Sequence, residues 1–264
     1  MTKKLFKYPR THHIEGSRLQ PGDEDLSAIS FKELMGKYLV VEEKVDGANA
    51  GLSFDREGNL LLQSRGHYLT GGYRERHFNM FKQWANHHRR WLHEVLEDKY
   101  VLYGEWLYAK HTVFYDELPH YFMEFDIYEK ESGLFLSTKR RQELLAGKPI
   151  VSVRVLHEGT LSSLKKLKAL IGPSAFIGEN HLDELRARTS KLNLDVERAL
   201  KETDCSNDME GLYVKVEEDG SVIGRYKFIR PGFLTAVLQA EGHWQNRPII
   251  PNKLSDSADM FTFA

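Results

Sequence analysis

The alternation of hydrophobic and polar positions in the first hundred residues predicts paired strands followed by one long helix. An apolar run that ends at Lys44 predicts a strand, and residues 51–54 and 60–65 predict a hairpin. From about residue 73 to residue 97, apolar side chains recur every three or four positions. This spacing predicts one amphipathic helix in residues 73–97.

The second half of the chain changes between β-rich and helical patterns. Residues 100–107 and 120–128 are aromatic, β-rich runs, and residues 211–216 and 222–229 predict a closing hairpin. Between these strands the pattern is mainly helical across residues 138–204. The helices expected there cover residues 139–146, 161–171, 182–188 and 194–203.

Both ends of the chain are less regular. Residues 1–30 are polar, and a loop of this length either lies in solvent or covers a site. Its basic cluster consists of Arg10, His12, His13 and Arg18. A capping box formed by Ser30 and Glu33 predicts a short helix that ends at Gly36. The tail, residues 231–264, is expected to hold one helix.

The size and composition predict a single α+β domain. The chain has 264 residues, of which 41% are hydrophobic, enough for a substantial core. No internal repeat or low-complexity linker interrupts it, so we expect residues 1–264 to form one domain. The 37 basic and 38 acidic residues nearly cancel, so contact with nucleic acid would need a local basic patch.

Cysteine content and hydropathy limit the cellular compartments in which we expect the protein. The single cysteine, Cys205, cannot form an internal disulfide, and the N-terminal residues lack the apolar run of a signal peptide. These features predict a reducing, cytoplasmic location. No stretch approaches the roughly 18 apolar residues of a membrane span, so we expect no membrane partner. The spacing of Cys and His excludes a structural zinc finger.

Lys44 is the candidate nucleophile. It ends a predicted strand just before a tight turn at Asp46 and Gly47, so its amine would be held on a fixed backbone. An amine with an ordinary pKa of about 10.4 is protonated at neutral pH and attacks only when burial or cationic neighbours disfavour its charge. Taken alone, this short motif also fits a surface lysine before a turn.

Arg225 and Lys227 are candidate phosphate ligands. They lie two positions apart on a predicted strand, so their side chains project from the same face. Two fixed cations suit a phosphate, and their charge would help to keep a nearby lysine unprotonated. The alternative is an ordinary solvent-facing strand.

Three further positions are candidates for the site. Glu210 has the parity of the buried side chains of its strand, so it needs either a metal ion or a salt-bridge partner. Gly104, next to Glu105, could let a ligand approach the backbone closely. Phe125 shares a face with apolar residues, which fits core packing or a stacking platform for a base.

These residues fall within six motifs. The motifs are KVDG at Lys44, SRG at Ser64, GEWLY at Glu105, FMEFDIY at Phe125, EGLYVK at Glu210 and RYKFIR at Lys227. In this order they resemble nucleotidyltransferase motifs I, Ia, III, IIIa, IV and V of the covalent ligase and capping-enzyme superfamily. The detailed form is most similar to ATP-dependent RNA ligases, and the resemblance covers about residues 40–230.

The resemblance implies a role for each position. Lys44 would attack the α-phosphorus of ATP and carry AMP, and Lys227, with Arg225 at the partner position, would act on the α-phosphate as further catalytic groups. Arg65 and Glu105 would hold the ribose. The other implied site residues are Phe125 as the adenine platform, Glu43, Asp46, Gly47, Asn49 and Lys215 as further nucleotide contacts, and Glu210 as the ligand of Mg²⁺ or Mn²⁺.

The implied fold is an α+β, ATP-grasp-like adenylation domain of two antiparallel sheets flanked by helices, with ATP in the cleft between them. The implied activity joins RNA 5′-phosphate and 3′-OH ends through lysyl-AMP and RNA-adenylate intermediates, in RNA repair. The chain departs from the pattern at Arg225, where such ligases usually have a lysine. Only 37 residues follow Lys227, too few for the OB domain of DNA ligases and capping enzymes.

The expected partners are RNA ends and a separate end-healing kinase or phosphatase, and the expected state is a monomer. The alternatives within enzymes are a DNA ligase and a GTP-using capping enzyme. The alternative from another class is a non-catalytic subunit that binds RNA ends. The presence of Lys44, Glu105, Glu210 and Lys227 argues against that last alternative.

Overall fold

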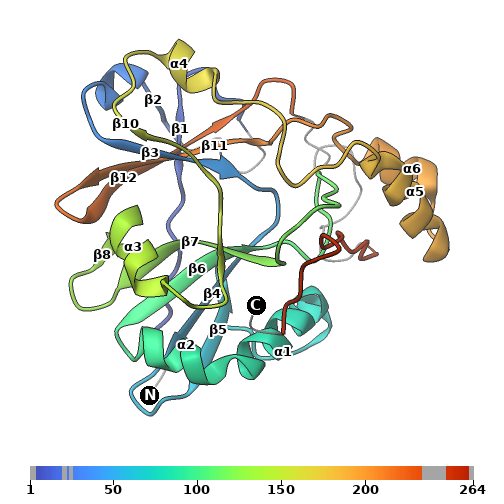
Figure 1. Cartoon of the computed structure of the whole chain (residues 1–264), viewed down its shortest axis with the longest axis horizontal. Helices are drawn as coiled ribbons and strands as arrows, with labels where there is room; N and C mark the ends of the chain where they lie inside the picture. Colours follow the sequence, from blue (N-terminus) through green and yellow to red (C-terminus); the bar gives the residue numbers. More distant parts are fainter. Residues whose placement is uncertain (1–3, 20–22, 24–25, 234–247, 262–264) are drawn as a thin grey trace.

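The computed structural model describes residues 4–19, 23, 26–233 and 248–261 (Figure 1). Its strands are β1 (His12–Ile14), β2 (Ala28–Ile29), β3 (Leu39–Lys44), β4 (Ala48–Phe54), β5 (Leu60–Ser64), β6 (Tyr100–Trp106), β7 (Phe122–Glu129), β8 (Leu134–Leu136), β9 (Val151–Ser152), β10 (Val155–Gly159), β11 (Gly211–Glu218) and β12 (Ser221–Ile229). Its helices are the 3₁₀ helices η1 (Phe31–Leu34) and η2 (Tyr73–Phe78), and α1 (Asn79–His87), α2 (Arg89–Leu96), α3 (Thr138–Leu145), α4 (Leu164–Lys168), α5 (His181–Lys191) and α6 (Val196–Lys201).

The strands form one hydrogen-bonded sheet in the order β10-β3-β11-β12-β8-β7-β6-β4-β5. Most pairs are antiparallel, whereas β1 is parallel to β12 and β2, and β9 is parallel to β7. The two sheets of the prediction are instead two halves of this sheet, because β8 pairs with β12 through Leu136 and with β7 through Phe135. We call β1, β2, β3, β10, β11 and β12 the β3 half, and β4, β5, β6, β7 and β9 the β6 half (Figure 1).

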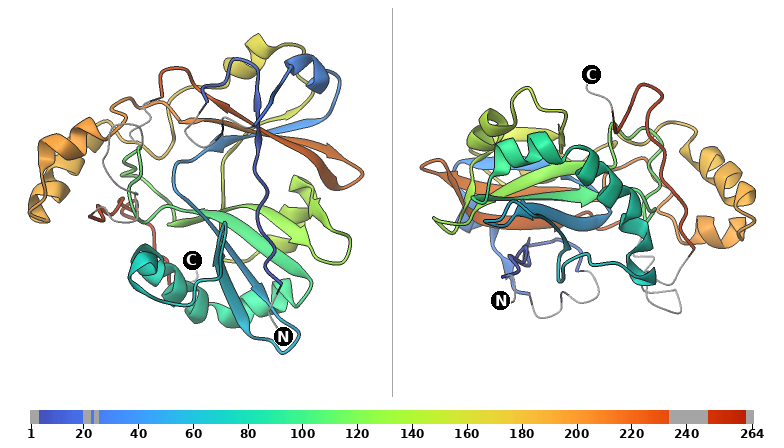
Figure 2. Two further views of the ribbon diagram at one scale, coloured as in Figure 1. Left: turned by 180° about the vertical axis from the view of Figure 1, so that it is seen from behind. Right: turned by 90° about the horizontal axis from the view of Figure 1, so that it is seen from below.

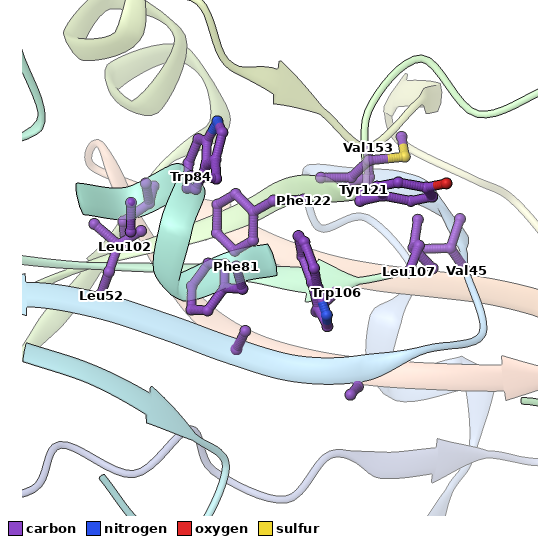
Figure 3. Close-up of a cluster of buried hydrophobic side chains, with 14 of the residues drawn as sticks. Val45, Leu52, Phe81, Trp84, Leu102, Trp106, Leu107, Tyr121, Phe122 and Val153 are labelled. Carbon is purple, nitrogen blue, oxygen red and sulfur yellow. The ribbon is translucent and has the colours of Figure 1, made fainter. Parts of the chain in front are cut away.

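The β6 half is covered by α1 and α2, and its core is built from aromatic rings (Figures 2 and 3). The ring of Phe81 in α1 lies 5.3 Å from that of Trp106 and 5.2 Å from that of Phe122, measured between centroids. Trp84 contacts Phe122 at 5.2 Å. Removing one such ring from a core costs about 3–5 kcal/mol. The core therefore gives β6 and β7 a rigid support.

The β3 half has a core of its own. Val41 of β3 and Val214 of β11 are buried in one cluster with Phe31 of η1 and Leu167 of α4, which lie over this half in Figure 1. A third cluster combines residues of both halves with the N-terminal segment. Its buried members are Tyr8, Val101, Tyr103, Phe135 and Val222.

The single helix predicted across residues 73–97 is divided into η2, α1 and α2. The break lies at His88, whose φ and ψ of −92° and 9° leave the helical region. The ring of His88 is buried, with Nε2 2.9 Å from the carbonyl oxygen of Met260, so a contact with the tail accompanies the break. The predicted apolar face is confirmed, since Phe81, Trp84, Trp91 and Val95 are all buried.

Several short elements differ from the prediction. Residues 1–30, predicted to be irregular, contain β1 and β2, and the mainly helical segment 138–204 also contains β9 and β10. β10 pairs with β3, the strand that carries Lys44. These strands have two to five residues, too few to show a clear alternation. The capping box of Ser30 and Glu33 is confirmed, although the helix that it begins is 3₁₀.

The helix expected in the tail falls in the stretch after Pro231, where residues 234–247 lie outside the described residues. Residues 248–261 return to the end of β6. There, Asn252 donates from Nδ2 to the carbonyl of Leu107 (2.7 Å) and accepts from the amide of Tyr115 (3.0 Å). Within the described ranges, no helix has both the length and the apolar character needed to cross a membrane.

Candidate active site

A cleft of about 1320 Å³ beside the end of β3 brings most of the predicted site residues together. The predicted residues on its wall are Glu43, Lys44, Asp46, Gly47, Asn49, Arg65, Glu105, Phe125, Glu210 and Lys227. They come from both halves of the sheet. The two other predicted residues, Arg225 and Lys215, are not among the lining residues.

Lys44 is held at the cleft by a buried carboxylate. It faces Gly211 across the β3–β11 pair, and its Nζ donates to Oε2 of the adjacent Glu210 (2.7 Å). Burial lowers the pKa of Lys44, but the carboxylates of Glu210 and Glu105 outweigh burial and raise the pKa above its ordinary value. The expectation that neighbouring cations keep Lys44 uncharged is therefore wrong for the free protein. A nucleophilic role for this amine would require it to lose its proton and its pairing with Glu210.

The turn after Lys44 is fixed by its own residues. Oδ2 of Asp46 accepts from the amides of Thr112 (2.7 Å) and Val113 (2.9 Å), and the amide of Asp46 donates to the Tyr115 hydroxyl (2.8 Å). A Cβ on Gly47 would lie 2.7 Å from the carbonyl oxygen of Trp106. The turn therefore needs glycine for close packing, and it holds Lys44 at one place.

Glu105 faces Asn49 across the β4–β6 pair and lies on the cleft wall. Burial raises the pKa of Glu105 to about 7, although Lys44 and Arg65 oppose this shift. The preceding Gly104 does not serve a ligand as predicted, because a Cβ there would lie 2.6 Å from the Phe122 ring. Glu105 is thus a carboxyl group that changes charge near neutral pH beside the candidate nucleophile.

Phe125 packs on other rings, as the core-packing interpretation predicted, and its role as a platform for a base stays a prediction. Its ring packs on Tyr8, with centroids 5.3 Å apart, and on Tyr213, at 6.3 Å, while it also lines the cleft. Its carbonyl oxygen accepts hydrogen bonds from Arg141 and Lys215. The backbone behind the ring is therefore fixed, which suits a ring that must present one face to a base.

Lys227 is paired with the N-terminal segment. β1 lies parallel to β12 with His13 opposite Lys227, and the Lys227 Nζ donates to Oδ2 of Asp23. The same oxygen lies 3.1 Å from Nε2 of the fully buried His13. Burial lowers the pKa of Lys227, Asp23 opposes this effect, and the charge of Lys44 adds to it. Two lysines in one cleft are thus each neutralised by one carboxylate.

Residues of the N-terminal segment therefore line the cleft, which agrees with the second of the two options predicted for this loop, that it covers a site. Of the predicted basic cluster, Arg10 pairs with Asp23 at 3.4 Å, but neither it nor His13 lies on the cleft wall. Tyr8, Thr11 and Asp23 lie on the wall instead. Sequence reasoning missed these three because a loop carries no periodic pattern that places its side chains.

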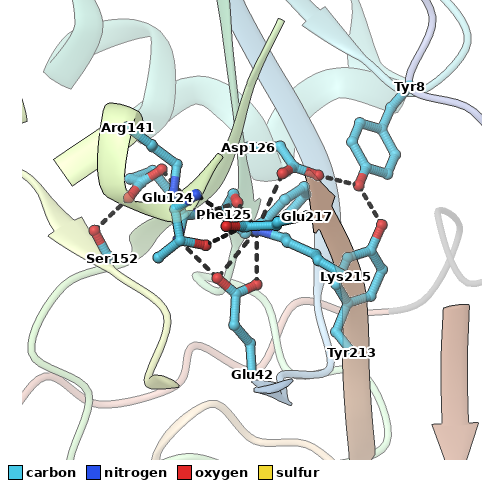
Figure 4. Close-up of polar contacts among 11 residues, drawn as sticks. Tyr8, Glu42, Glu124, Phe125, Asp126, Arg141, Ser152, Tyr213, Lys215 and Glu217 are labelled. Atoms are coloured by element: carbon cyan, nitrogen blue, oxygen red, sulfur yellow. Dashed lines mark hydrogen bonds and ion pairs between the residues drawn. The ribbon is translucent and has the colours of Figure 1, made fainter. Parts of the chain in front are cut away.

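Lys215 lies behind the cleft in a buried network of charges (Figure 4). Its Nζ is 2.9 Å from Oε2 of Glu42 and 3.0 Å from Oδ1 of Asp126. Arg141 of α3 joins the same network, 2.7 Å from Glu42 and 3.4 Å from Glu124. The network ties β3, β7, β11 and α3 together directly behind Lys44 and Phe125.

Arg225 also lies away from the cleft wall. Its guanidinium carbon is 3.8 Å from the centroid of the Phe135 ring and 5.5 Å from that of Tyr8. It therefore packs on the aromatic cluster between the halves. The predicted contacts of Arg225 and Lys215 with a nucleotide stay predictions, and their placement in the free protein gives both a structural role.

The carboxylates around Lys44 fit a divalent cation that is shared with a substrate. Glu210 is buried at the wall and Glu105 lies close by, and such oxygen donors suit Mg²⁺ or Mn²⁺. Within the described residues, no group of three or more His, Cys, Asp and Glu side chains is placed to hold a metal. Mg²⁺ commonly takes one or two carboxylates and completes its shell with phosphate oxygens, so the arrangement matches a cation that arrives with a phosphate compound.

The fold resembles solved structures of RNA ligases. A variant of the Naegleria gruberi RNA ligase with ATP and Mn matches with a TM-score of 0.52 and 18% identity over 87% of this chain and 57% of that chain. Another variant of that ligase, without ligand, matches with a TM-score of 0.50 and 18% identity over 90% of this chain and 60% of the other. The chain thus spans less than two thirds of the length of these proteins. A comparison with curated proteins gives no match.

A sequence model of the RNA ligase family matches residues 37–229, most of the chain. This range begins just before β3 and ends with β12, so it contains the two strands that carry Lys44 and Lys227. Tyr8, Thr11 and Asp23 lie outside it. On the basis of this match, the chain belongs to the RNA ligase family.

Proposed function

We propose that this protein is an ATP-dependent RNA ligase that forms a covalent lysyl-AMP at Lys44. The observation that carries the proposal is the position of the Lys44 Nζ, 2.7 Å from buried Glu210 on a cleft wall that also contains Glu105, Phe125 and Lys227. A nucleophile, two carboxylates, an aromatic ring and a second cation meet there. This set supplies what the transfer of a nucleotide to an amine requires.

The proposed reaction has three balanced steps. The Lys44 amine, after losing a proton, forms a P–N bond to the α-phosphorus of ATP while the bond to pyrophosphate breaks. The oxygen of an RNA 5′-phosphate then attacks this phosphorus and releases the lysine, which gives RNA-adenylate. Finally, an RNA 3′-OH attacks the 5′-phosphate, loses its proton and releases AMP. Covalent catalysis divides a difficult joining into easier transfers.

The chain's own residues would bind and orient ATP. Phe125 would stack on adenine, ionised Glu105 would accept hydrogen bonds from the ribose, and Lys227 would exchange Asp23 for an α-phosphate oxygen. Glu210 would hold a divalent cation, which supplies positive charge as the phosphate oxygens become more negative. The related Naegleria ligase variants solved with ATP and Mn support these ligands.

Incubation with ATP labelled in the α-phosphate, in the presence of Mg²⁺ or Mn²⁺, tests the first step. We expect the label on the polypeptide, its loss in Lys44→Ala, and its retention in Lys99→Ala, which removes an exposed lysine on a turn outside the cleft wall. Unlabelled wild-type protein, or a labelled Lys44→Ala variant, would contradict the proposal. Labelled GTP in a parallel reaction separates a ligase from a capping enzyme.

Joining assays test the later steps. We expect sealing of a 5′-phosphorylated RNA to a 3′-OH RNA, more efficiently than the equivalent DNA. A role in RNA repair, with a separate kinase or phosphatase preparing the ends, is part of the same proposal. Adenylylation without sealing of any RNA end would limit the protein to nucleotide transfer, whereas RNA binding without adenylylation would identify it as a non-catalytic subunit.

A further inference from the structure

The cleft is larger than ATP alone requires. Its volume of about 1320 Å³ exceeds the roughly 300–1000 Å³ of ordinary small-molecule sites. Part of its wall is formed by residues 64–78, the loop between β5 and η2 together with η2 itself. The motif SRG covers residues 64–66 of this stretch, and the resemblance gave a role only to Arg65. We call residues 64–78 the arm of the cleft.

The arm presents an aromatic ring and an arginine as a pair. Tyr73, at 72% exposure, is the most exposed large hydrophobic side chain in the described residues, and it lines the cleft. The guanidinium carbon of Arg76 lies 4.2 Å from the centroid of the Tyr73 ring. An exposed ring that already stacks on an arginine is the type of surface on which unpaired bases stack.

The arm is a built structure. Glu75 is buried, accepts hydrogen bonds from the amides of Thr70 (3.2 Å) and Gly71 (2.8 Å), and pairs with Lys82 of α1 at 2.6 Å. Gly71 and Gly72 have φ of +118° and +108°, a conformation that glycine adopts without strain. The loop is therefore fixed at Glu75, two residues after Tyr73.

The charges of the arm favour an anionic ligand. Arg65, Arg74 and Arg76 all line the cleft, whereas the carboxylate of Glu75 is already neutralised by Lys82. The charge of Arg65 also acts on Glu105, so the arm is continuous with the wall around Lys44. The whole chain has a net charge of −1, so this concentration of arginines is local. Phosphates of a nucleic acid are the ligands that such a cluster attracts.

Resting on the proposed function, the geometry points to a binding site for an unpaired RNA 5′ end: a terminal base stacks on Tyr73, which Arg76 supports, while Arg74 contacts the phosphates. Bases in a continuous duplex are covered by their neighbours, so a stacking platform favours single-stranded ends over a nicked duplex. Because Tyr73, Arg74 and Lys44 line the same cleft, a 5′-phosphate bound at this site would share the cleft with Lys44.

Transfer from preformed enzyme–AMP to a 5′-phosphorylated single-stranded RNA tests this site. For each variant, the transfer rate at limiting RNA is divided by the amount of enzyme–AMP present at the start, so that losses in the first step cancel. We expect Tyr73→Ala to lower this ratio about tenfold and Tyr73→Trp to restore it, because any aromatic ring stacks on a base. Arg74→Ala should lower the ratio less and weaken its salt dependence.

The matched controls are exposed residues of the same two types, tyrosine and arginine, that lie outside the cleft wall. Tyr38→Ala removes an exposed tyrosine outside the cleft wall, and Arg90→Ala removes an exposed arginine that pairs only with a helix neighbour in the described structure. Neither should change the ratio. An unchanged ratio in Tyr73→Ala, or an equal loss in Tyr38→Ala, overturns the assignment. An equal loss by Tyr73→Ala on a fully paired nicked duplex overturns the preference for unpaired ends.

A binding measurement separates this inference from the proposed function. Fluorescence anisotropy of a labelled, 5′-phosphorylated RNA oligonucleotide reports binding without ATP or chemistry. If wild-type protein fails to self-adenylylate but still binds the RNA, and Tyr73→Ala weakens binding about tenfold, the platform stands and the ligase activity does not. If self-adenylylation succeeds and Tyr73→Ala binds RNA as wild type does, only the platform is wrong.

Discussion

Lys44 and Lys215 lie on neighbouring strands and each pairs with glutamate, yet their surroundings differ. Lys44 has 23% of its side chain exposed at the cleft and pairs with Glu210 at 2.7 Å. Lys215 is 1% exposed and is held by Glu42 at 2.9 Å, by Asp126 at 3.0 Å and by the carbonyl of Phe125. The same ammonium group thus occurs once at an accessible wall and once inside the protein.

The difference shows what makes a lysine available for reaction. Lys44 can leave its carboxylate at a wall where a substrate or cation can replace it. If Lys215 left its position, buried Asp126 would lose its paired cation and Glu42 would keep only Arg141, which costs several kcal/mol. The proposed function gives reaction to Lys44, and the buried position of Lys215 gives it structural support. The following changes test that division, from the largest expected effect to the smallest.

Lys44→Arg should abolish self-adenylylation and leave the fold intact. Arginine keeps a positive charge for Glu210 but cannot lose a proton to become a nucleophile. We expect the rate of labelling to fall by at least about 10⁴-fold, with a melting temperature within a few degrees of wild type. Residual labelling within tenfold of wild type would place the nucleophile elsewhere.

Lys215→Met should have the opposite profile. It removes the cation between Glu42 and Asp126 while keeping a similar volume, so the free energy of unfolding should fall by about 3–5 kcal/mol. Urea denaturation measures this loss. Folded Lys215→Met protein should still be labelled at Lys44. A variant as stable as wild type that cannot be labelled would show that Lys215 acts on the nucleotide, as the sequence predicted.

The pH profile of self-adenylylation tests whether the carboxylates of the cleft differ from those of the buried network. The pKa of Glu105 is raised to about 7, so the group is mainly protonated at pH 6 and mainly ionised at pH 8. We expect apparent ATP affinity to rise up to tenfold across this range, because the carboxylate accepts ribose hydrogen bonds. Glu105→Gln should remove most of this dependence of apparent ATP affinity on pH. A profile that is identical in this variant would assign the change to ATP or to another group.

Asp23→Asn tests a third lysine, Lys227. It lines the cleft as Lys44 does, and its carboxylate partner comes from a distant part of the chain. The carboxylate of Asp23 accepts a hydrogen bond from the Lys227 Nζ, the group that would contact the α-phosphate in the proposed mechanism. Removing its charge should lower the KM for ATP about fivefold, which corresponds to roughly 1 kcal/mol. Ser27→Ala, a substitution in the same N-terminal segment but outside the cleft wall, serves as the control. A raised KM would mean that Asp23 positions Lys227 for catalysis.

The sequence located the site well where a motif has a local geometry of its own. The strand that ends at Lys44, the glycine turn after it and the apolar face at Phe81 and Trp84 all follow from nearest-neighbour patterns. The motif order also predicted which distant residues gather at the cleft, including Glu105 and Glu210. Their catalytic roles stay predictions until the variants above are measured.

Parity arguments were weaker because they place a side chain on a face without saying what covers that face. Arg225 and Lys227 are two positions apart on β12 as expected, but only Lys227 reaches the cleft. Arg225 lies over the ring of Phe135, a residue of β8, which is the strand next to β12. In the same way, the protonated state of Lys44 depends on carboxylates that no local pattern places beside it.

The sequence by itself determined the family, the candidate nucleophile and its turn. The family follows from the order of six short motifs, and the nucleophile and turn follow from a few adjacent residues whose chemistry and backbone preferences are fixed. Tertiary structure alone decided that the halves join through β8, that Asp23 reaches Lys227, and that Lys215 is buried while Lys44 is partly exposed at the cleft. The physical reason is that burial and charge pairing depend on distances between segments remote in sequence. Such distances are set only when the whole chain packs.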